Sequence, residues 1–299
     1  MRGPCPSAFA ERKPVRLILV PTAARPECAI ALDVAFGLAR DLDANVAACH
    51  VRPSRREQLV TSIERTGEDV YAGVVAAKAE GASLTSAAAQ ELFVRAAQQN
   101  GFKLARRPAL GKRRRAIWHD RVGSPGRVLG IVGPVADLAV VSRPKPRSAG
   151  RARAFLLAAL LHTARPVLIV PQRRLRALGK RIVIAWNQSA DAAVAVAAAL
   201  PLLQRAERLV VVTSGSEYRP GPKAAYLAQY LANWDVRVER VRTKGRDIEH
   251  EIEGVYRDVE ADLLVMGAYS RHWFRERVFG GVTEYMAFKA ELPVLMLHR

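Results

Sequence analysis

The sequence predicts an α/β protein built from two tandem, doubly wound, mainly parallel sheets of five strands each. One observation is an internal repeat of domain size: Ala136-Asp137-Leu138 recurs as Ala261-Asp262-Leu263, and Arg165-Pro166-Val167-Leu168 recurs as Leu292-Pro293-Val294-Leu295. Another is that short apolar runs alternate with helix-like segments, which is typical of parallel strands joined by crossover helices. The 299-residue length also suits two such domains.

The second copy shows this alternation most clearly. Its apolar runs are short enough for buried strands, and the segments between them have helical spacing. Asp247 is placed to cap a helix. The expected strands are 181–186, 209–213, 236–241, 263–266 and 294–297, and the expected helices are 190–204, 223–233, 247–259 and 283–289.

The first copy follows the same plan with about forty additional residues. We expect strands at 17–20, 46–51, 138–141 and 167–170, an outer strand in the region 103–116, and a helix at 151–161. The predicted organisation is a disordered lead-in at 1–14, a first domain at 15–172 with a helical insertion at about 53–100, a linker at 173–180, and a second domain at 181–299.

Composition indicates a globular protein of a reducing compartment. Hydrophobic residues make up 50% and charged residues 25%, no run is long enough to cross a membrane, and the N-terminus lacks the apolar core of a signal peptide. The three cysteines form no Cys-x-x-Cys pair, so neither a disulfide framework nor a zinc site is expected. The predicted location is the cytoplasm.

The positive charge is concentrated in the first copy. Residues 1–178 hold 30 Lys and Arg against 13 Asp and Glu, whereas residues 179–299 hold 17 against 15. The run KLARRPALGKRRR at 103–115 could bind a polyanion through phosphate contacts. It lacks interleaved aromatic residues for base stacking, so a solvated loop is the favoured interpretation and nucleic acid is disfavoured.

A glycine-containing segment near the C-terminus predicts a phosphate site. The apolar strand 263–266 stops at Gly267, a basic and aromatic loop follows, and Gly280 and Gly281 precede a helix. Glycines let the backbone approach an anion, and the amides at a helix start bind it. The matching segment of the first copy, 136–144, has no glycines, so only the second copy is expected to hold a nucleotide.

With these residues the chain resembles the universal stress proteins in their tandem form. Nucleotide-binding members carry Gly-x2-Gly-x9-Gly-[Ser/Thr], which fits here as Gly267, Ser270 in place of the second glycine, Gly280, and Gly281 at the Ser/Thr position, with Thr283 two residues on. The WNQS turn and the two PVL segments support the resemblance. It implies a Rossmann-like fold similar to the adenine nucleotide alpha hydrolases.

The resemblance also implies a set of nucleotide-binding residues. Arg271 and Arg275, in the connecting loop, could screen phosphate charge. Part of this set also has an interpretation without a ligand. Trp186 could be a core or interface residue, Asn187 could belong to a helix start with Ser189, and the glycine pair could only form a tight helix start. The implied positions are Ala185, Trp186 and Asn187 at the adenine and ribose, Thr213 and Ser214 over the base, Met266 and Gly267 beside base and ribose, and Gly280, Gly281, Val282 and Thr283 at the phosphates.

The implied function is binding of ATP, or of AMP or ADP, as a regulatory ligand in stress adaptation. The sequence does not decide whether magnesium binds with the nucleotide. No Walker Gly-Lys-[Ser/Thr] motif, nucleophile elbow or metal-ligand spacing of histidines occurs, so at most very slow ATP hydrolysis is expected. One alternative is the same fold without nucleotide, acting on an unknown protein partner. A third interpretation is polyanion binding by the basic N-terminal half.

The two PVL segments predict how the domains pair. Each is apolar, ends its copy and is expected at a sheet edge. The resemblance implies that two such strands pair antiparallel, here 167–170 with 294–297. The expected product is an intramolecular pseudo-dimer, whose outer surfaces could pair again in a homodimer.

Overall fold

The computed structural model describes residues 15–54, 71–145, 150–217, 220–268 and 281–298. The predicted lead-in at 1–14 lies outside these ranges, as do part of the predicted insertion, Ser270 and Gly280.

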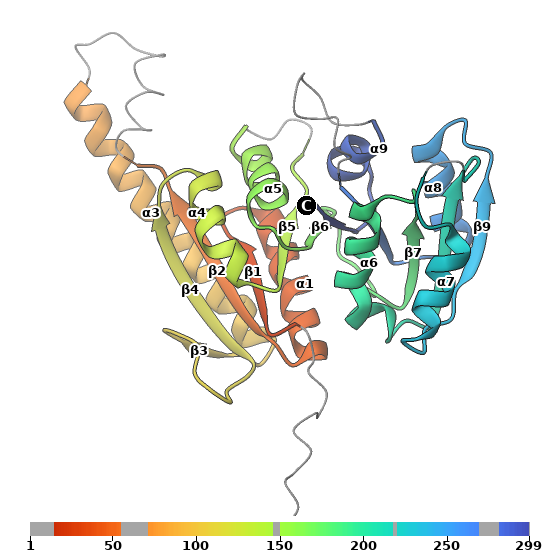
Figure 1. Cartoon of the computed structure of the whole chain (residues 1–299). Coiled ribbons are helices and arrows are strands. Elements are labelled where there is room, and N and C mark those ends of the chain that lie inside the picture. Colours follow the sequence, from red (N-terminus) through yellow and green to blue (C-terminus); the bar gives the residue numbers. More distant parts are fainter. Residues whose placement is uncertain (1–14, 55–70, 146–149, 218–219, 269–280, 299) are drawn as a thin grey trace, which may run out of the picture.

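All eleven strands of the described residues form one sheet, in the order β3-β4-β2-β1-β5-β6-β11-β10-β7-β8-β9 (Figure 1). Every neighbouring pair is parallel except β6 with β11. The predicted α/β class and mainly parallel pairing are confirmed. The strands are β1 (Leu17–Pro21), β2 (Asn45–Arg52), β3 (Lys103–Ala105), β4 (Arg115–Val122), β5 (Leu138–Ser142), β6 (Val167–Val170), β7 (Arg181–Ala185), β8 (Arg208–Ser214), β9 (Glu239–Thr243), β10 (Leu263–Gly267) and β11 (Val294–Leu297).

Helices cover both faces of the sheet, as crossover connections between parallel strands require. On one face lie α1, α3, α6 and α7, and on the other α4, α5, α8, α9 and the π-helix η4. The helices are α1 (Pro26–Leu42), α3 (Tyr71–Gln99), α4 (Pro125–Val132), the 3₁₀ turn η2 (Gly133–Val135), α5 (Gly150–His162), α6 (Ala190–Leu203), α7 (Ala224–Ala232), α8 (Ile248–Asp258), α9 (Gly281–Glu284) and η4 (Tyr285–Lys289).

Each face of the sheet has one hydrophobic core, and each core crosses from the first copy into the second. Successive strand residues point to opposite faces, so Ile18 and Val20 belong to one core and Leu19 to the other. Strand β6 and its partner β11 are buried along their whole length. The two copies therefore share their cores as well as their sheet.

The junction between the copies is the antiparallel ladder between β6 and β11. Leu168 lies opposite Leu295, and Val167 opposite Met296. The predicted pairing of 167–170 with 294–297 is confirmed. Because β11 also pairs with β10, the strand that was expected at an edge is hydrogen-bonded on both sides.

A buried arginine reinforces this junction. Arg143 follows β5, and its guanidinium donates from Nε to the Ala287 carbonyl (3.1 Å) and from Nη2 to the carbonyls of Met286 (2.8 Å) and Leu292 (3.0 Å). These acceptors belong to η4 and to the segment before β11. Since a helix end leaves carbonyls without intrahelical partners, one cation of the first copy supplies donors to the second.

The repeated Ala-Asp-Leu has the same role in both copies. Asp137 accepts hydrogen bonds from the backbone N–H groups of Arg16 (2.7 Å) and Leu17 (2.9 Å), where β1 begins. Asp262 accepts from Gly179 (2.8 Å) and its neighbours, where β7 begins. The aspartates before β5 and β10 therefore fix the start of the first strand of their respective copies.

The expected outer strand in the region 103–116 is confirmed only in part. The structure has a three-residue edge strand, β3, and a separate strand β4 that starts at Arg115 and runs parallel to it. The loop between them contains Pro108, which has no N–H, and both Gly111 (φ 67°) and Arg114 (φ 53°) have left-handed backbone. The basic run therefore lies mostly in an exposed loop. With β3 and β4 counted separately, the first copy contributes six strands instead of the expected five.

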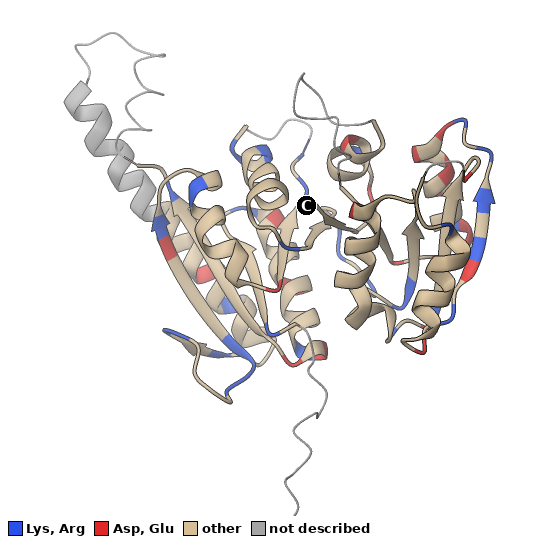
Figure 2. Ribbon diagram, viewed as in Figure 1, with Lys and Arg blue, Asp and Glu red and all other residues tan. Residues whose placement is uncertain are grey.

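Charged residues protect the two outer edges of the sheet. Lys103 lies on the short β3, and β9 carries Glu239, Arg240 and Arg242, which are exposed (Figure 2). Short, charged edge strands resist pairing with another chain. Strand β9 begins at Glu239, three residues after the expected start at Val236.

The β6–β11 ladder yields a stability prediction. Met296→Pro removes a backbone N–H that faces β6, at a cost of about 1–3 kcal/mol for the acceptor left unpaired. We expect this variant to aggregate or to show two melting transitions in calorimetry. Met296→Leu keeps the N–H and is expected to retain one transition, with a loss of less than about 1.5 kcal/mol. A single, unshifted transition for Met296→Pro would contradict the junction.

Candidate functional site

The expected nucleotide site lies at the carboxyl ends of three adjacent strands, β10, β7 and β8. Met266 lies opposite Ala185 across the β10–β7 ladder, so these two positions share one edge of the sheet. The chain leaves β7 toward β8 on one side and returns to β10 on the other. This is the switch in strand order at which open α/β sheets bind ligands.

The turn after β7 packs against the loop that precedes α7. Trp186 is buried with α6 and α7, and its Nε1 donates to the Pro222 carbonyl (2.8 Å). Gln188 is buried with φ 62° and accepts from Lys223 Nζ (3.1 Å). A Cβ on Gly221 would lie 2.0 Å from the Gln188 carbonyl oxygen. Trp186 is therefore a core residue, which was the alternative interpretation of this position.

Asn187 and Ser189 form the start of α6. Asn187 is exposed, and its Oδ1 accepts from the Ser189 hydroxyl (2.6 Å) and backbone N–H (3.2 Å). Ser189 Oγ in turn accepts from the Ala192 N–H (3.1 Å) as the N-cap. Asn187 thus makes the contacts of a residue at a helix start, as its alternative interpretation expected.

Gly267 is required by packing at the end of β10. A Cβ at this position would lie 2.5 Å from the backbone nitrogen of Ala192 and 2.7 Å from the carbonyl carbon of Asp191. Only glycine lets the first turn of α6 approach β10 this closely. The positive end of the α6 dipole is thereby held beside the switch point.

The end of β8 is bonded to α8 through a carboxylate. Ser214 Oγ donates to Glu251 Oε2 (3.0 Å), and the backbone N–H groups of Gly245 (2.8 Å) and Arg246 (3.0 Å) donate to the same carboxylate. The Thr243 hydroxyl contributes most to holding the pKa of Glu251 at about 2, followed by the Gly245 amide. Sequence reasoning missed Glu251, because only the fold brings α8 beside Ser214.

The phosphate segment is described only in part. Gly281 begins α9 and is exposed, Val282 is half-buried, and Thr283 is buried. A Cβ on Gly281 would meet no atom within 4 Å. Ser270, Arg271, Arg275 and Gly280 lie outside the described residues.

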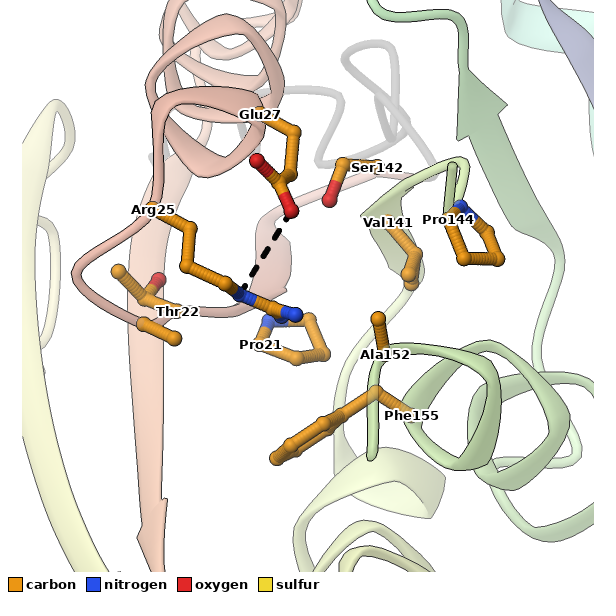
Figure 3. A pocket seen from close by; sticks show the side chains of 10 residues that line it. Pro21, Thr22, Arg25, Glu27, Val141, Ser142, Pro144, Ala152 and Phe155 are labelled. Carbon is orange, nitrogen blue, oxygen red and sulfur yellow. Dashed lines mark ion pairs between the residues drawn. The ribbon is translucent and has the colours of Figure 1, made fainter. Parts of the chain in front are cut away.

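The matching place in the first copy is almost closed. Its cavity has a volume of about 10 Å³, room for about one water molecule. Arg25 extends across it, with Nε 3.8 Å from Glu27 Oε1, and Pro21, Ser142 and Phe155 complete the walls (Figure 3). A nucleotide does not fit here without rearrangement of these side chains.

Membrane spans and metal clusters are absent from the part of the chain that the structure describes. None of the described helices is long and apolar enough to cross a membrane. Within the same residues, no group of three or more His, Cys, Asp or Glu side chains could hold a metal ion.

The Glu251 contacts yield a pH prediction. The pKa falls from 4.5 to about 2 on folding, so the carboxylate stabilises the fold fully above pH 4.5 and loses this contribution as pH falls toward 2. Glu251→Gln should therefore melt below wild type at pH 7, with a difference that shrinks between pH 4.5 and 3. Glu249→Gln on the same helix is the control. A pH-independent difference for Glu251→Gln would contradict the assignment.

Comparison with known proteins places the C-terminal half in a family. Residues 179–298 match the model of the universal stress protein family. A comparison with curated protein sequences found no significant match.

Solved structures resemble the chain over nearly its whole length. A universal stress protein from Archaeoglobus fulgidus is 16% identical with a TM-score of 0.65, and the match covers 97% of this chain and 100% of that one. A putative universal stress protein from Pseudomonas aeruginosa is 12% identical with a TM-score of 0.54, covering 95% and 94%. A functionally unknown protein from the same species is 13% identical with a TM-score of 0.56, covering 95% and 93%. Residues 179–298 thus match the universal stress protein family, and the whole chain shares its fold with solved structures described as universal stress proteins.

Proposed function

We propose that the chain binds one adenine nucleotide, ATP or a close relative, as a regulatory ligand in stress adaptation. The nucleotide would lie in the second of two domains, 15–172 and 181–299, over the carboxyl ends of β10 and β7. The observation that carries this proposal is the family match over 179–298, which coincides with the copy whose switch point is flanked by Gly267 and the start of α6. Binding without turnover is proposed, since the sequence has neither a Walker Gly-Lys-[Ser/Thr] motif nor a nucleophile elbow.

The fold suggests a division of roles among the candidate residues. Ala185, Met266 and Gly267 would line the floor, because they end adjacent strands. The amides of Gly281 and Val282 and the hydroxyl of Thr283 would bind phosphate, because they begin a helix. Trp186, Thr213 and Ser214 would act as walls, because their side chains are buried or bonded within the protein.

A second candidate function is protein interaction without nucleotide. It is favoured by the contact of Gly221 and Pro222 with the turn at Trp186 and Gln188, which draws the β8–α7 loop against the turn after β7. Mass spectrometry of the purified full-length protein separates the two functions. A co-purifying adenine nucleotide supports the first, and its absence together with no heat of binding for added ATP supports the second.

Stoichiometry tests the asymmetry between the copies. We expect calorimetry of the full chain with ATP to give one site, because the first-copy cavity of about 10 Å³ is closed by Arg25 and Phe155. Arg25→Ala shortens the side chain that crosses this cavity and should still leave one site, because the segment 136–144 lacks the glycines of the second copy. A stoichiometry near two for the wild type would refute the assignment.

A pair of variants at Gly281 tests the phosphate position. A Cβ here meets open space, so Gly281→Ala should fold and bind ATP nearly as wild type does. Gly281→Asp adds a negative charge at the helix start and should weaken ATP binding by about 1–2 kcal/mol, or roughly 5- to 30-fold. Thermal shift with and without ATP measures both effects. Equal ATP-induced shifts in the two variants would exclude phosphate from this position.

A further inference from the structure

A large cavity lies at the junction of the two copies, beside the proposed nucleotide site. Its volume is about 500 Å³, within the range of small-molecule sites. Its walls come from the segment after β5, the connection between β6 and β7, helix α5, and the stretch from α9 to β11. The cavity exists only because β6 pairs with β11.

Arg143 is the most deeply buried cation in the wall of this cavity. This residue is 5% exposed, and its Nε and Nη2 donate hydrogen bonds to three backbone carbonyls. The remaining nitrogen, Nη1, is buried without a hydrogen-bond partner among the described residues. Burial lowers the pKa of Arg143 to about 10, so the guanidinium stays charged at neutral pH. A buried, charged N–H without an acceptor is costly, and an anionic oxygen would relieve that cost.

The other polar groups of the wall have a positive surplus. Arg153 lies 3.7 Å from Glu284, which balances those two charges. By formal charge, the lining holds five cations against the carboxylates of Glu284 and Glu291, a surplus of three. Such a surplus suits a dianion better than a monoanion. Besides Arg153, the cations are Arg143, Lys145, Arg173 and Lys289.

Apolar surface fills the space between these charges. Phe288 lines the cavity beside Pro144, Pro171 and Ala290. The guanidinium of Arg153 lies over the Phe288 ring, 4.1 Å from its centroid, which holds the ring in place. Apolar walls with a few convergent charges are the usual composition of a small-molecule site.

From this arrangement we infer that the junction cavity binds a small organic phosphate. The phosphate is attracted by the buried charge of Arg143 and by the cations of the rim, and the apolar part of the ligand packs against Phe288. Since residues of both copies form the walls, the ligand would contact both halves of the chain. The two sites are neighbours, since Glu284 of the cavity wall follows the proposed phosphate residues Gly281 to Thr283 on α9.

Phenyl phosphate is a suitable probe, because it joins a dianion to one apolar ring. We expect calorimetry of the full-length protein to show one phenyl phosphate per chain, bound at least about tenfold more tightly than inorganic phosphate or phenol. Lys289→Glu should weaken this binding about tenfold or more, because it reverses an exposed charge of the rim. Arg240→Glu reverses an exposed charge on the distant β9 and should leave binding unchanged.

Three outcomes would overturn the inference. They are an absence of phenyl phosphate binding, equal affinities of the Lys289→Glu and Arg240→Glu variants, and loss of binding in Gly281→Asp, which would move the anion to the nucleotide site. Retained phenyl phosphate binding in Gly281→Asp, or in a protein that does not bind ATP, supports the junction site independently of the proposed function.

Discussion

The antiparallel ladder between β6 and β11 is the constraint on which the rest of this structure depends. It joins two parallel half-sheets into one sheet of eleven strands and makes each hydrophobic core continuous across both copies. Arg143 adds three hydrogen bonds from the first copy to carbonyls of the second. The same pairing closes the walls of the junction cavity. Assembly between two chains is not required for this arrangement, because one chain supplies both strands.

The two copies share the contacts at their strand starts and differ at the carboxyl ends of the corresponding strands. Asp137 and Asp262 hold corresponding strand starts by the same hydrogen bonds. At the other end of these strands, the first copy has Ser142 and Arg143 where the second has Gly267 and Ala268. Gly267 admits the first turn of α6, whereas Arg143 turns toward the other copy. In the first copy this position thus contributes to the junction, whereas in the second copy it lies at the switch point where we propose a nucleotide.

Much of the candidate site turns out to serve the fold as well. Ser214 and Glu251 tie β8 to α8, and Trp186 ties β7 to the loop before α7. Such contacts hold the edge of the sheet rigid, which lowers the entropic cost of ordering a bound ligand. Glu251 and Gly221 were missed because their partners are distant in sequence. The local signal was the Arg-Pro-Gly-Pro segment around Gly221, which indicates a turn but not the residue against which the turn packs.

The sequence by itself determined most of the strand and helix order and the internal repeat, and its resemblance to a known family implied the pairing of the two PVL strands. The element order and the repeat follow from apolar periodicity, from Asp and Ser caps, and from repeated segments, all of which act over a few residues. The tertiary structure alone decided that residues 103–116 form an edge strand, a loop and the start of β4, that Trp186 is core, and that Arg143 bridges the copies. Those outcomes depend on which side chains meet across the sheet, and a linear pattern carries no information about such distant contacts.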